Sequence, residues 1–312
     1  MSEARTGWAH SPTVPVLEIG GTHVTAALVR IGSGPARVVA EHREPLDGEG
    51  PAEAVTAALL RAGRALPAGA PARWGVALPG PFDYARGIAR YRGVGKFDAL
   101  DGLDLGALLA AGLPGCTGVA FLNDAEAFAR GEWIEGAGRG RAALVAVTLG
   151  TGVGSAFLRE GTAVTSGETV PPEGRADLIS HQGRPLEDSV SRRALIAAYR
   201  RASGRRLDVR EIAAAARGGD AAAARVLSQA FGALGQALAP WLRRFGAEAL
   251  VVGGSMTGSW DLIEPALTAG LRADGGAAPR PVLARRPRDA ALIGAAWHAR
   301  AARADAPVRL PD

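Results

Sequence analysis

Short apolar runs separated by turns or by amphipathic segments fill the first 136 residues. Five apolar runs predict strands, at 16–19, 24–31, 36–46, 72–78, where Pro79-Gly80-Pro81 stops the strand, and 118–124. Apolar residues three and four apart predict helices at 50–66, 103–113 and 125–136. The resulting order, βββαβαβα, predicts an α/β layer in which helices flank a mixed sheet.

The same pattern restarts at residue 142. The stretch "AALVAVTLGTGVGSAFLREG" and the opening stretch "VLEIGGTHVTAALV" are both an apolar strand, a glycine turn and a second apolar strand. Aligning them pairs Gly20 with Gly150 and Thr22 with Gly152. The repeat predicts two related halves with a cleft between them, although a shared turn motif also arises by chance.

The second half continues with a polar, irregular segment at 161–183. Apolar periodicity after it predicts helices at 184–203, 208–219, 220–245, 260–272 and 289–304. Two further strands are predicted at 247–254 and 281–286.

The chain is basic, and arginine supplies nearly all of its positive charge. Net charge is +5 with a pI near 10.2, and Lys96 is the only lysine beside 35 arginines. Arginine pairs such as Arg192-Arg193 and Arg200-Arg201 are spread among alanines on helical segments, and 31 acidic residues accompany them. We therefore expect a solvated surface and no nucleic-acid partner, which would require clustered basic residues.

Cysteine content and hydropathy define the expected compartment. The single cysteine, Cys116, excludes an internal disulfide and argues against a structural zinc site. The first fifteen residues lack an apolar core of signal-peptide length, and no window reaches 18 apolar residues. We expect a cytoplasmic protein without a membrane partner.

Three glycine turns at strand ends are candidates for binding phosphate. They are Gly20-Gly21-Thr22, Gly150-Thr151-Gly152 and Gly253-Gly254-Ser255. Glycines let several backbone N–H groups approach phosphate oxygens, and the third turn is predicted to open a helix with a positive end. Each turn taken singly also fits a purely structural role, because none is a Walker A loop.

Asp124 in "FLNDAEAF" follows an apolar strand and precedes a helix. It is either the N-cap of that helix or a general base at the carboxyl end of a strand, where α/β proteins place their ligands. Asn123 beside it can hydrogen-bond a polyol.

The motifs "EIGGT", "ALPGPFD", "FLND", "LGTGVG" and "VVGGSMTGSWDLIEPAL" occur in the order found in the ROK family of sugar kinases and repressors. The chain resembles that family from Val16 to about Arg300. This resemblance implies two actin-like, ribonuclease H-like lobes that close on ATP and a sugar. The lobes would span 1–122 joined by the C-terminal helix at 289–312, and 123–288.

The resemblance also implies roles for individual residues. Gly20, Gly21 and Thr22 match the first phosphate loop, and Gly150, Thr151 and Gly152 match the second. Gly253, Gly254 and Ser255 would lie along the adenosine. Pro79, Gly80 and Asn123 match sugar-side positions, and Asp124 matches the catalytic base that accepts the proton of the attacking hydroxyl.

Two departures from the family pattern alter these expectations. Family kinases usually carry Asp where this chain has Glu18, whose extra methylene still allows a water-mediated Mg²⁺ contact. The cysteines of the family's zinc loop are absent, so no structural zinc is expected.

The expected acceptor follows from the segment "PPEGRADLISHQGRPLEDSVS", which lacks the family's Glu-x-Gly-His element. Glu187 matches a retained sugar-binding carboxylate, and Glu173 or Asp177 is a candidate for the missing element. His181 is either a ligand or, as is more common in such loops, a surface histidine. Loss of contacts to the anomeric end favours a C7 cyclitol of the valiolone or valienol type, with glucose or mannose as the alternative.

Two other functions remain for comparison with the kinase. A repressor of this family carries a helix-turn-helix before the first phosphate loop, and we do not expect one in the fifteen residues here. A non-catalytic sugar or nucleotide sensor would explain Glu18 and the altered sugar motif, but has less need of Asp124 and the three turns. The resemblance further implies a homodimer.

Overall fold

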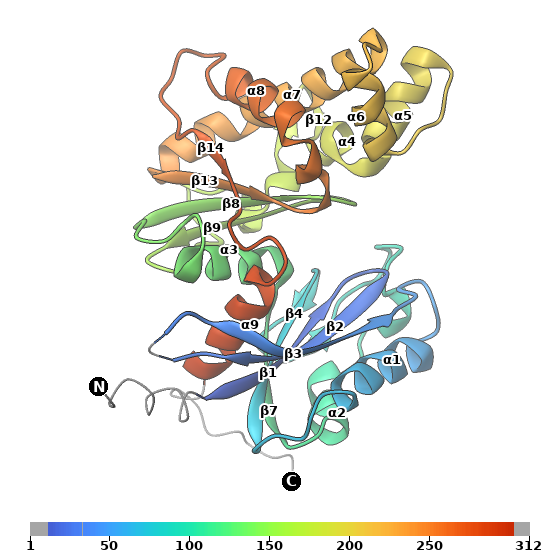
Figure 1. The fold of residues 1–312 in the computed structure, drawn as a ribbon, viewed down its shortest axis with the longest axis vertical. Coiled ribbons are helices and arrows are strands. Elements are labelled where there is room, and N and C mark those ends of the chain that lie inside the picture. The colour runs from blue at the N-terminus through green and yellow to red at the C-terminus, as the bar shows by residue number, and fades with distance from the viewer. Residues whose placement is uncertain (1–11, 33, 303–312) are drawn as a thin grey trace, which may run out of the picture. The chain divides into compact units, whose positions relative to one another are not determined.

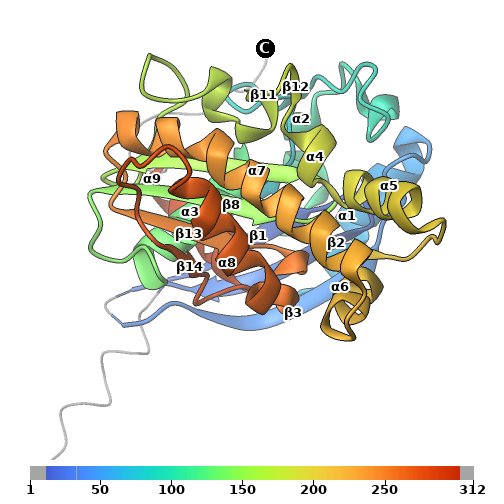
Figure 2. The same cartoon turned by 90° about the horizontal axis from the view of Figure 1, so that it is seen from above.

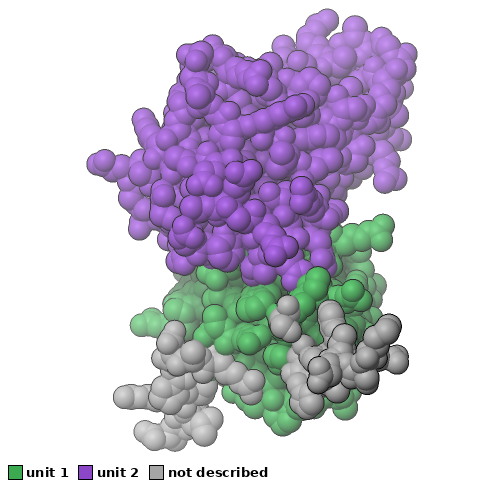
Figure 3. Space-filling view, turned by 60° about the vertical axis from the view of Figure 1, so that its left-hand side comes forward, with its two compact units in different colours: residues 1–131, 288–312 green, residues 132–287 purple. Residues whose placement is uncertain are grey.

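The computed structural model describes residues 12–32 and 34–302, which form two compact units. The first unit contains residues 1–131 and 288–312, and the second contains 132–287 (Figure 3). The first division falls inside helix α3 (Asp124–Glu135), whereas the sequence predicts it between 122 and 123.

A five-stranded mixed sheet forms the centre of the first unit, in the order β3-β2-β1-β4-β7 (Figure 1). Its strands are β1 (Thr13–Ile19), β2 (His23–Arg30), β3 (Arg37–Pro45), β4 (Ala72–Leu78) and β7 (Cys116–Asn123). The first three strands are antiparallel neighbours, while β1, β4 and β7 run parallel to one another. The structure confirms the predicted order of strands and helices, and adds short elements in one connection: β5 (Phe82–Asp83), β6 (Ile88–Ala89) and η1 (Asp98–Leu100).

Helices cover both faces of this sheet because side chains alternate along each strand. Leu17 and Ile19 of β1 belong to the core shared with α1 (Ala52–Arg64) and α2 (Leu105–Gly112). Val14 and Val16 belong to the opposite core, which includes α9 (Ala290–Ala301). The last helix of the chain therefore completes the first sheet.

The second unit repeats this sheet topology. Its order is β10-β9-β8-β13-β14, from β8 (Ala143–Leu149), β9 (Val153–Arg159), β10 (Thr162–Ala163), β13 (Ala249–Gly253) and β14 (Pro281–Leu283). Strands β8, β9 and β10 are antiparallel neighbours, and β13 and β14 run parallel to β8. The two sheets thus share order and direction, as the repeated glycine turns predict.

Five helices and one large apolar core cover one face of the second sheet. They are α4 (Glu187–Val190), α5 (Arg192–Ser203), α6 (Val209–Arg217), α7 (Ala221–Phe245) and α8 (Trp260–Leu271). The long helix α7 lies beside α8 above strands β8 and β13 (Figure 2).

Two predicted elements of the second unit are wrong in detail. The helix predicted at 184–203 is divided: Arg184–Pro185 form strand β12 with β11 (Ser180–His181), and α4 ends before Ser191. Ser191 is extended and its side chain accepts the Ala194 N–H at 3.3 Å, so it caps a new helix. The third glycine turn does not open α8 directly, because the 3₁₀ segment η4 (Ser255–Ser259) intervenes.

The strand predicted at 281–286 ends at Leu283 because a buried carboxylate accepts hydrogen bonds from the backbone N–H groups that follow. Glu132 is fully buried and accepts the N–H groups of Arg285 at 3.0 Å, Arg286 at 2.6 Å and Ala137 at 2.7 Å. Three backbone donors compensate the cost of burying this charge.

A helix that crosses a membrane must be both long and apolar, and this requirement applies to each of the described helices. None of them combines the two to the degree that a membrane crossing requires.

Candidate active site

One edge of the first sheet collects most of the predicted chemistry of that unit. Since β1, β4 and β7 are parallel, their carboxyl ends meet at the same edge. Glu18 lies opposite Ala77, and Leu78 lies opposite Asn123. The first glycine turn, the Pro79-Gly80 loop and Asp124 all begin where these strands end.

The first turn keeps two backbone donors unused. Its hairpin is closed by the Gly20 N–H to His23 O at 2.9 Å, and the carbonyls of Gly21 and Thr22 accept from Gly48 and Leu46. The N–H groups of Gly21 and Thr22 make no hydrogen bond to any residue that the structure describes. Two adjacent unpaired N–H groups at a turn are donors of the kind that bind phosphate oxygens.

Asp124 is close enough to Glu18 to affect the charge of the Glu18 carboxyl. Burial, and after it the Asp124 carboxylate, raise the pKa of Glu18 to about 7, while Arg43 opposes the shift. Burial also raises the pKa of Asp124, with Lys96 acting in the opposite direction. Two neighbouring carboxylates repel each other, and a cation or a proton shared between them lowers the free energy of the pair.

The position of Asp124 is compatible with both roles expected for it, helix cap and general base. It is the first residue of α3, and its Oδ1 accepts the Ala125 N–H at 2.9 Å. Asn123 is the fuller cap, because its Oδ1 accepts from Ala125 at 2.9 Å and Glu126 at 3.2 Å. Capping therefore does not require Asp124, and its raised pKa suits a proton acceptor.

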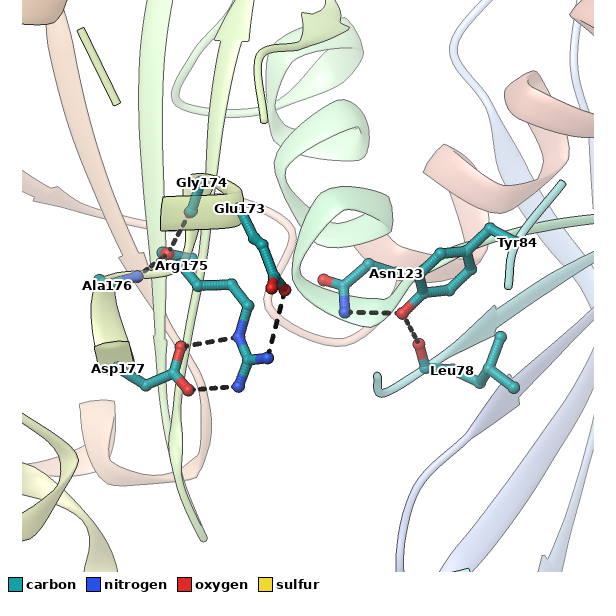
Figure 4. A network of polar contacts seen from close by, with 9 residues as sticks. Leu78, Tyr84, Asn123, Glu173, Gly174, Arg175, Ala176 and Asp177 are labelled. Carbon is teal, nitrogen blue, oxygen red and sulfur yellow. Dashed lines mark hydrogen bonds and ion pairs between the residues drawn. The ribbon is translucent and has the colours of Figure 1, made fainter. Parts of the chain in front are cut away.

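A tyrosine ties Asn123 to the loop after β4 (Figure 4). The Asn123 amide donates to the Tyr84 hydroxyl at 3.2 Å, and that hydroxyl donates to Leu78 O at 3.3 Å. Tyr91 donates to Pro79 O at 2.6 Å, so two phenols hold the Pro79-Gly80 loop. This arrangement positions predicted sugar-side residues of the first unit together.

The second and third glycine turns adjoin within the second unit. They follow β8 and β13, which are parallel neighbours with Gly253 opposite Thr148. Gly254 has φ +92°, and a Cβ there would overlap the backbone of Leu149, so only glycine fits this close approach. The N–H groups of Thr151 and Gly152 again make no hydrogen bond to the described residues.

Of the predicted acceptor carboxylates, Glu187 lies nearest to a phosphate turn. A Cβ at Gly152 would stand 2.5 Å from Glu187 Oε1. Burial raises the pKa of Glu187, and the Asp177 carboxylate adds to the increase. Glu187 and Asp177 therefore belong to one electrostatic group.

Arg175 binds the two candidates for the missing sugar element (Figure 4). It contacts Asp177 through two nitrogens, at 3.2 and 2.6 Å, and Glu173 at 3.5 Å. The Glu173 side chain is 72% exposed and that of Asp177 is 13% exposed, so Asp177 is the better candidate for the missing sugar element. His181 is half-buried, and its Nε2 contacts no polar partner among the described residues.

The arginines of α5 are more clustered than the sequence indicates. A cavity of about 800 Å³ is lined by Thr151 of the second turn together with Arg192, Arg193, Arg200, Arg201 and Arg206. Helical periodicity brings residues eight apart onto one face, which corrects the expectation that these pairs are dispersed. The cavity offers a basic environment beside a phosphate-type turn.

No group of three or more His, Cys, Asp or Glu side chains within 12–32 and 34–302 is arranged to bind a metal ion. Mg²⁺, however, often takes one or two carboxylates and completes its shell with water and substrate phosphates. The repulsion that the Asp124 carboxylate exerts on Glu18 fits such a partial set of ligands.

Comparison with known proteins identifies the family. The model of the ROK family matches residues 15–302. The chain belongs to the ROK family. A search of curated proteins finds no match.

Solved ROK structures share this fold. The ROK hexokinase of Thermus thermophilus is 27% identical, with 95% of this chain and 100% of that chain covered and a TM-score of 0.73. A ROK glucokinase of Streptomyces griseus, solved with glucose and AMPPNP, is 22% identical, with 93% and 100% covered and a TM-score of 0.73. A ROK transcriptional regulator, a homologue of the E. coli MLC protein, is 21% identical, with 93% and 78% covered and a TM-score of 0.72. The fold is therefore shared by kinases and a regulator.

One residue near the candidate site escapes sequence reasoning. Lys96 lies against the first glycine turn, since a Cβ at Gly21 would stand 2.5 Å from its Cδ and 3.2 Å from its Nζ. Its signal in the sequence is its uniqueness among 35 arginines.

Proposed function

We propose that this ROK protein is an ATP-dependent kinase that transfers the γ-phosphoryl group to a primary hydroxyl of a sugar or sugar-like cyclitol. The observation that carries the proposal is the set of groups at the carboxyl edge of the first sheet. There, a turn with two unused N–H donors adjoins Asp124, a carboxylate of raised pKa that is not needed as the sole helix cap. The glucokinase relative solved with glucose and AMPPNP supports the same chemistry.

In the proposed reaction, the acceptor hydroxyl oxygen attacks the γ-phosphorus and the bond from that phosphorus to the bridging oxygen breaks. Asp124 accepts the hydroxyl proton, and ADP leaves with the electron pair of the broken bond. Positioning and neutralisation of charge supply most of the acceleration in phosphoryl transfer. General-base assistance by Asp124 adds about 10²- to 10⁴-fold.

The phosphate groups are assigned to the glycine turns of both units. In the turn Gly20-Gly21-Thr22 the unused N–H groups of Gly21 and Thr22 are the donors, and in the turn at 150–152 those of Thr151 and Gly152 are. The third turn, at 253–255, is assigned to the adenosine. The arginine-lined cavity beside Thr151 attracts the anionic donor.

Glu18 is assigned to Mg²⁺ through water. Bound Mg²⁺ supplies charge neutralisation at the phosphates. Glu18 is the second-last residue of the strand that leads into the phosphate turn. The Asp124 carboxylate disfavours loss of the Glu18 proton, and a bound cation would offset that repulsion.

For the acceptor we favour a C7 cyclitol of the valiolone or valienol type over glucose or mannose. Asn123, Pro79 and Gly80 retain the sugar-side positions of the first unit. In the second unit Arg175 pairs with Asp177 and Glu173, the two candidates for the missing family element. Glu187 is then the acceptor carboxylate that this arginine does not bind. A site with fewer groups for the anomeric end suits an acceptor without an anomeric centre.

A screen of ADP release over hexoses, amino sugars and C7 cyclitols tests this function. We expect turnover that requires ATP, with a cyclitol as the best acceptor, and we expect Asp124→Asn to abolish most of it. Better turnover of glucose or mannose than of any cyclitol would refute the acceptor and leave the kinase intact.

A non-catalytic sensor is the alternative, and the ROK regulator of the same fold favours it. If calorimetry shows that the protein binds ATP and an acceptor, and the two together give no ADP release, the protein is a sensor. The expected homodimer is tested by light scattering.

A further inference from the structure

We propose that Lys96 is a catalytic residue whose ammonium binds a non-bridging oxygen of the transferred phosphoryl group. The inference rests on the proposed kinase function and adds a group that none of the glycine motifs contains. Its basis is the position of this lysine against the first phosphate turn and near Asp124.

The position of Lys96 is defined by direct contacts. A Cβ at Gly21 would stand 2.5 Å from Lys96 Cδ, 3.2 Å from Cε and 3.2 Å from Nζ. A Cβ at Gly48 would stand 3.3 Å from Lys96 Cγ. The stem therefore crosses Gly21, and the absence of a side chain there leaves the space that it fills.

The loop around Lys96 holds this position. Asp98 Oδ1 accepts the N–H groups of Val94 and Gly95, each at 2.9 Å, which shapes the chain immediately before the lysine. Phe97 follows with φ +62°, its N–H donates to Gly48 O at 2.6 Å, and its ring is 1% exposed. A buried neighbour in a left-handed conformation fixes the direction in which Lys96 leaves the backbone.

The charge of Lys96 is unused within the described part of the chain. Its ammonium forms no hydrogen bond or ion pair with residues 12–32 or 34–302, whereas many arginines of the protein are paired with carboxylates. Lys96 is half-buried, so leaving it without a partner is costly unless a ligand supplies one. It acts on Asp124 electrostatically by opposing the rise in that residue's pKa.

An anion is the ligand that satisfies all of these groups. The unused N–H groups of Gly21 and Thr22 and the Lys96 ammonium are all donors, and the lysine side chain packs against the turn that carries the two N–H groups. A compact ammonium binds phosphate as a point charge. Its interaction with the transferred group becomes stronger as negative charge develops on that group. Lys96 therefore favours the transition state more than the bound nucleotide.

Kinetic variants separate this role from a structural one. Lys96→Met keeps an unbranched apolar stem over Gly21 and removes the charge, so we expect kcat to fall about 10²- to 10³-fold with an unchanged KM for the acceptor. Lys96→Arg keeps the charge and should recover part of kcat. Arg92→Met is the matched control, because Arg92 belongs to the same loop, is 91% exposed and pairs with Asp101. Wild-type kcat in Lys96→Met would overturn the proposal.

The uniqueness of Lys96 allows a second test that needs no acceptor. Acetic anhydride modifies only this side-chain amine and the chain's α-amino group, and mass spectrometry follows the Lys96 peptide. We expect AMPPNP with Mg²⁺, and inorganic pyrophosphate, to slow acetylation at least about fivefold. Adenosine, which has no phosphate, should leave the rate unchanged.

The outcomes distinguish the two proposals. If AMPPNP raises the melting temperature but leaves acetylation of Lys96 unchanged, or if adenosine protects equally, the lysine assignment fails and the kinase proposal stands. If neither AMPPNP nor pyrophosphate binds, the kinase proposal fails and the Lys96 assignment fails with it.

Discussion

Replacing Glu18 by glutamine should stabilise the ligand-free protein at alkaline pH. Burial and, second to it, the Asp124 carboxylate together raise the pKa of Glu18 from 4.5 to about 7. The folded state therefore holds a proton that the unfolded state releases at lower pH. The free energy of unfolding consequently decreases as pH rises from 4.5 to about 7, and the loss is complete above that window.

The size of the effect follows from the width of the window. At about 1.4 kcal/mol for each pH unit, an interval from 4.5 to about 7 corresponds to no more than about 3.5 kcal/mol. Solvent reaches part of this half-buried side chain, which makes about 1 to 3 kcal/mol the expected gain for Glu18→Gln. Glutamine keeps the length and volume of the side chain, so packing changes little.

Urea unfolding at about pH 5 and about pH 8, without Mg²⁺ or nucleotide, measures this gain. Glu18→Gln should exceed the wild type clearly at the higher pH and much less at the lower. Glu44→Gln is the control with opposite sign, because a hydrogen bond from Arg61 lowers the pKa of Glu44. An equal difference between Glu18→Gln and the wild type at both pH values would refute the electrostatic account of Glu18.

Three further substitutions test the site and the fold. Asp124→Asn should lower kcat about 10²- to 10⁴-fold, or raise the barrier by about 3 to 5 kcal/mol, and ADP release within tenfold of the wild type would contradict its role as base. Gly254→Ala should lower the free energy of unfolding by about 1 to 3 kcal/mol because φ is +92° and β8 leaves no room, as judged by thermal unfolding. Gly258→Ala, in open space, is its control, and equal stability of the two variants would count against the argument. Tyr84→Phe removes the hydroxyl that accepts from Asn123 and should raise the acceptor KM about fivefold with little effect on kcat, whereas a change in kcat alone would contradict a positioning role.

Local chemistry made much of the fold predictable. Each apolar strand of the first unit has side chains that are buried on alternate faces, and each glycine turn has a backbone requirement that other residues meet poorly. These properties depend on residues a few positions apart, so the order of elements and the turns at 20–22 and 150–152 follow from the sequence. Helix boundaries were less predictable, since Ser191 begins a new helix through a side-chain cap rather than through any break in apolar periodicity.

The candidate site depends on contacts between residues distant along the chain. The sequence identifies Glu18 and Asp124 separately, but only the parallel pairing of β1, β4 and β7 places their charges together and raises the pKa of Glu18 to about 7. Burial and Coulomb interaction are properties of the folded surroundings, which the residue type alone does not define.

The same distinction applies to Lys96 and to the arginines of α5. Composition shows one lysine among 35 arginines, and motifs identify the glycine turn, yet neither connects residue 96 to residue 21. That connection arises because the Phe97 backbone bonds to Gly48, which in turn bonds to Gly21. The sequence by itself determined the strands and the turns, because these depend on local spacing, and the order of its motifs already resembled the family. The tertiary structure decided which charges face a turn, because that depends on how the strands and loops pack.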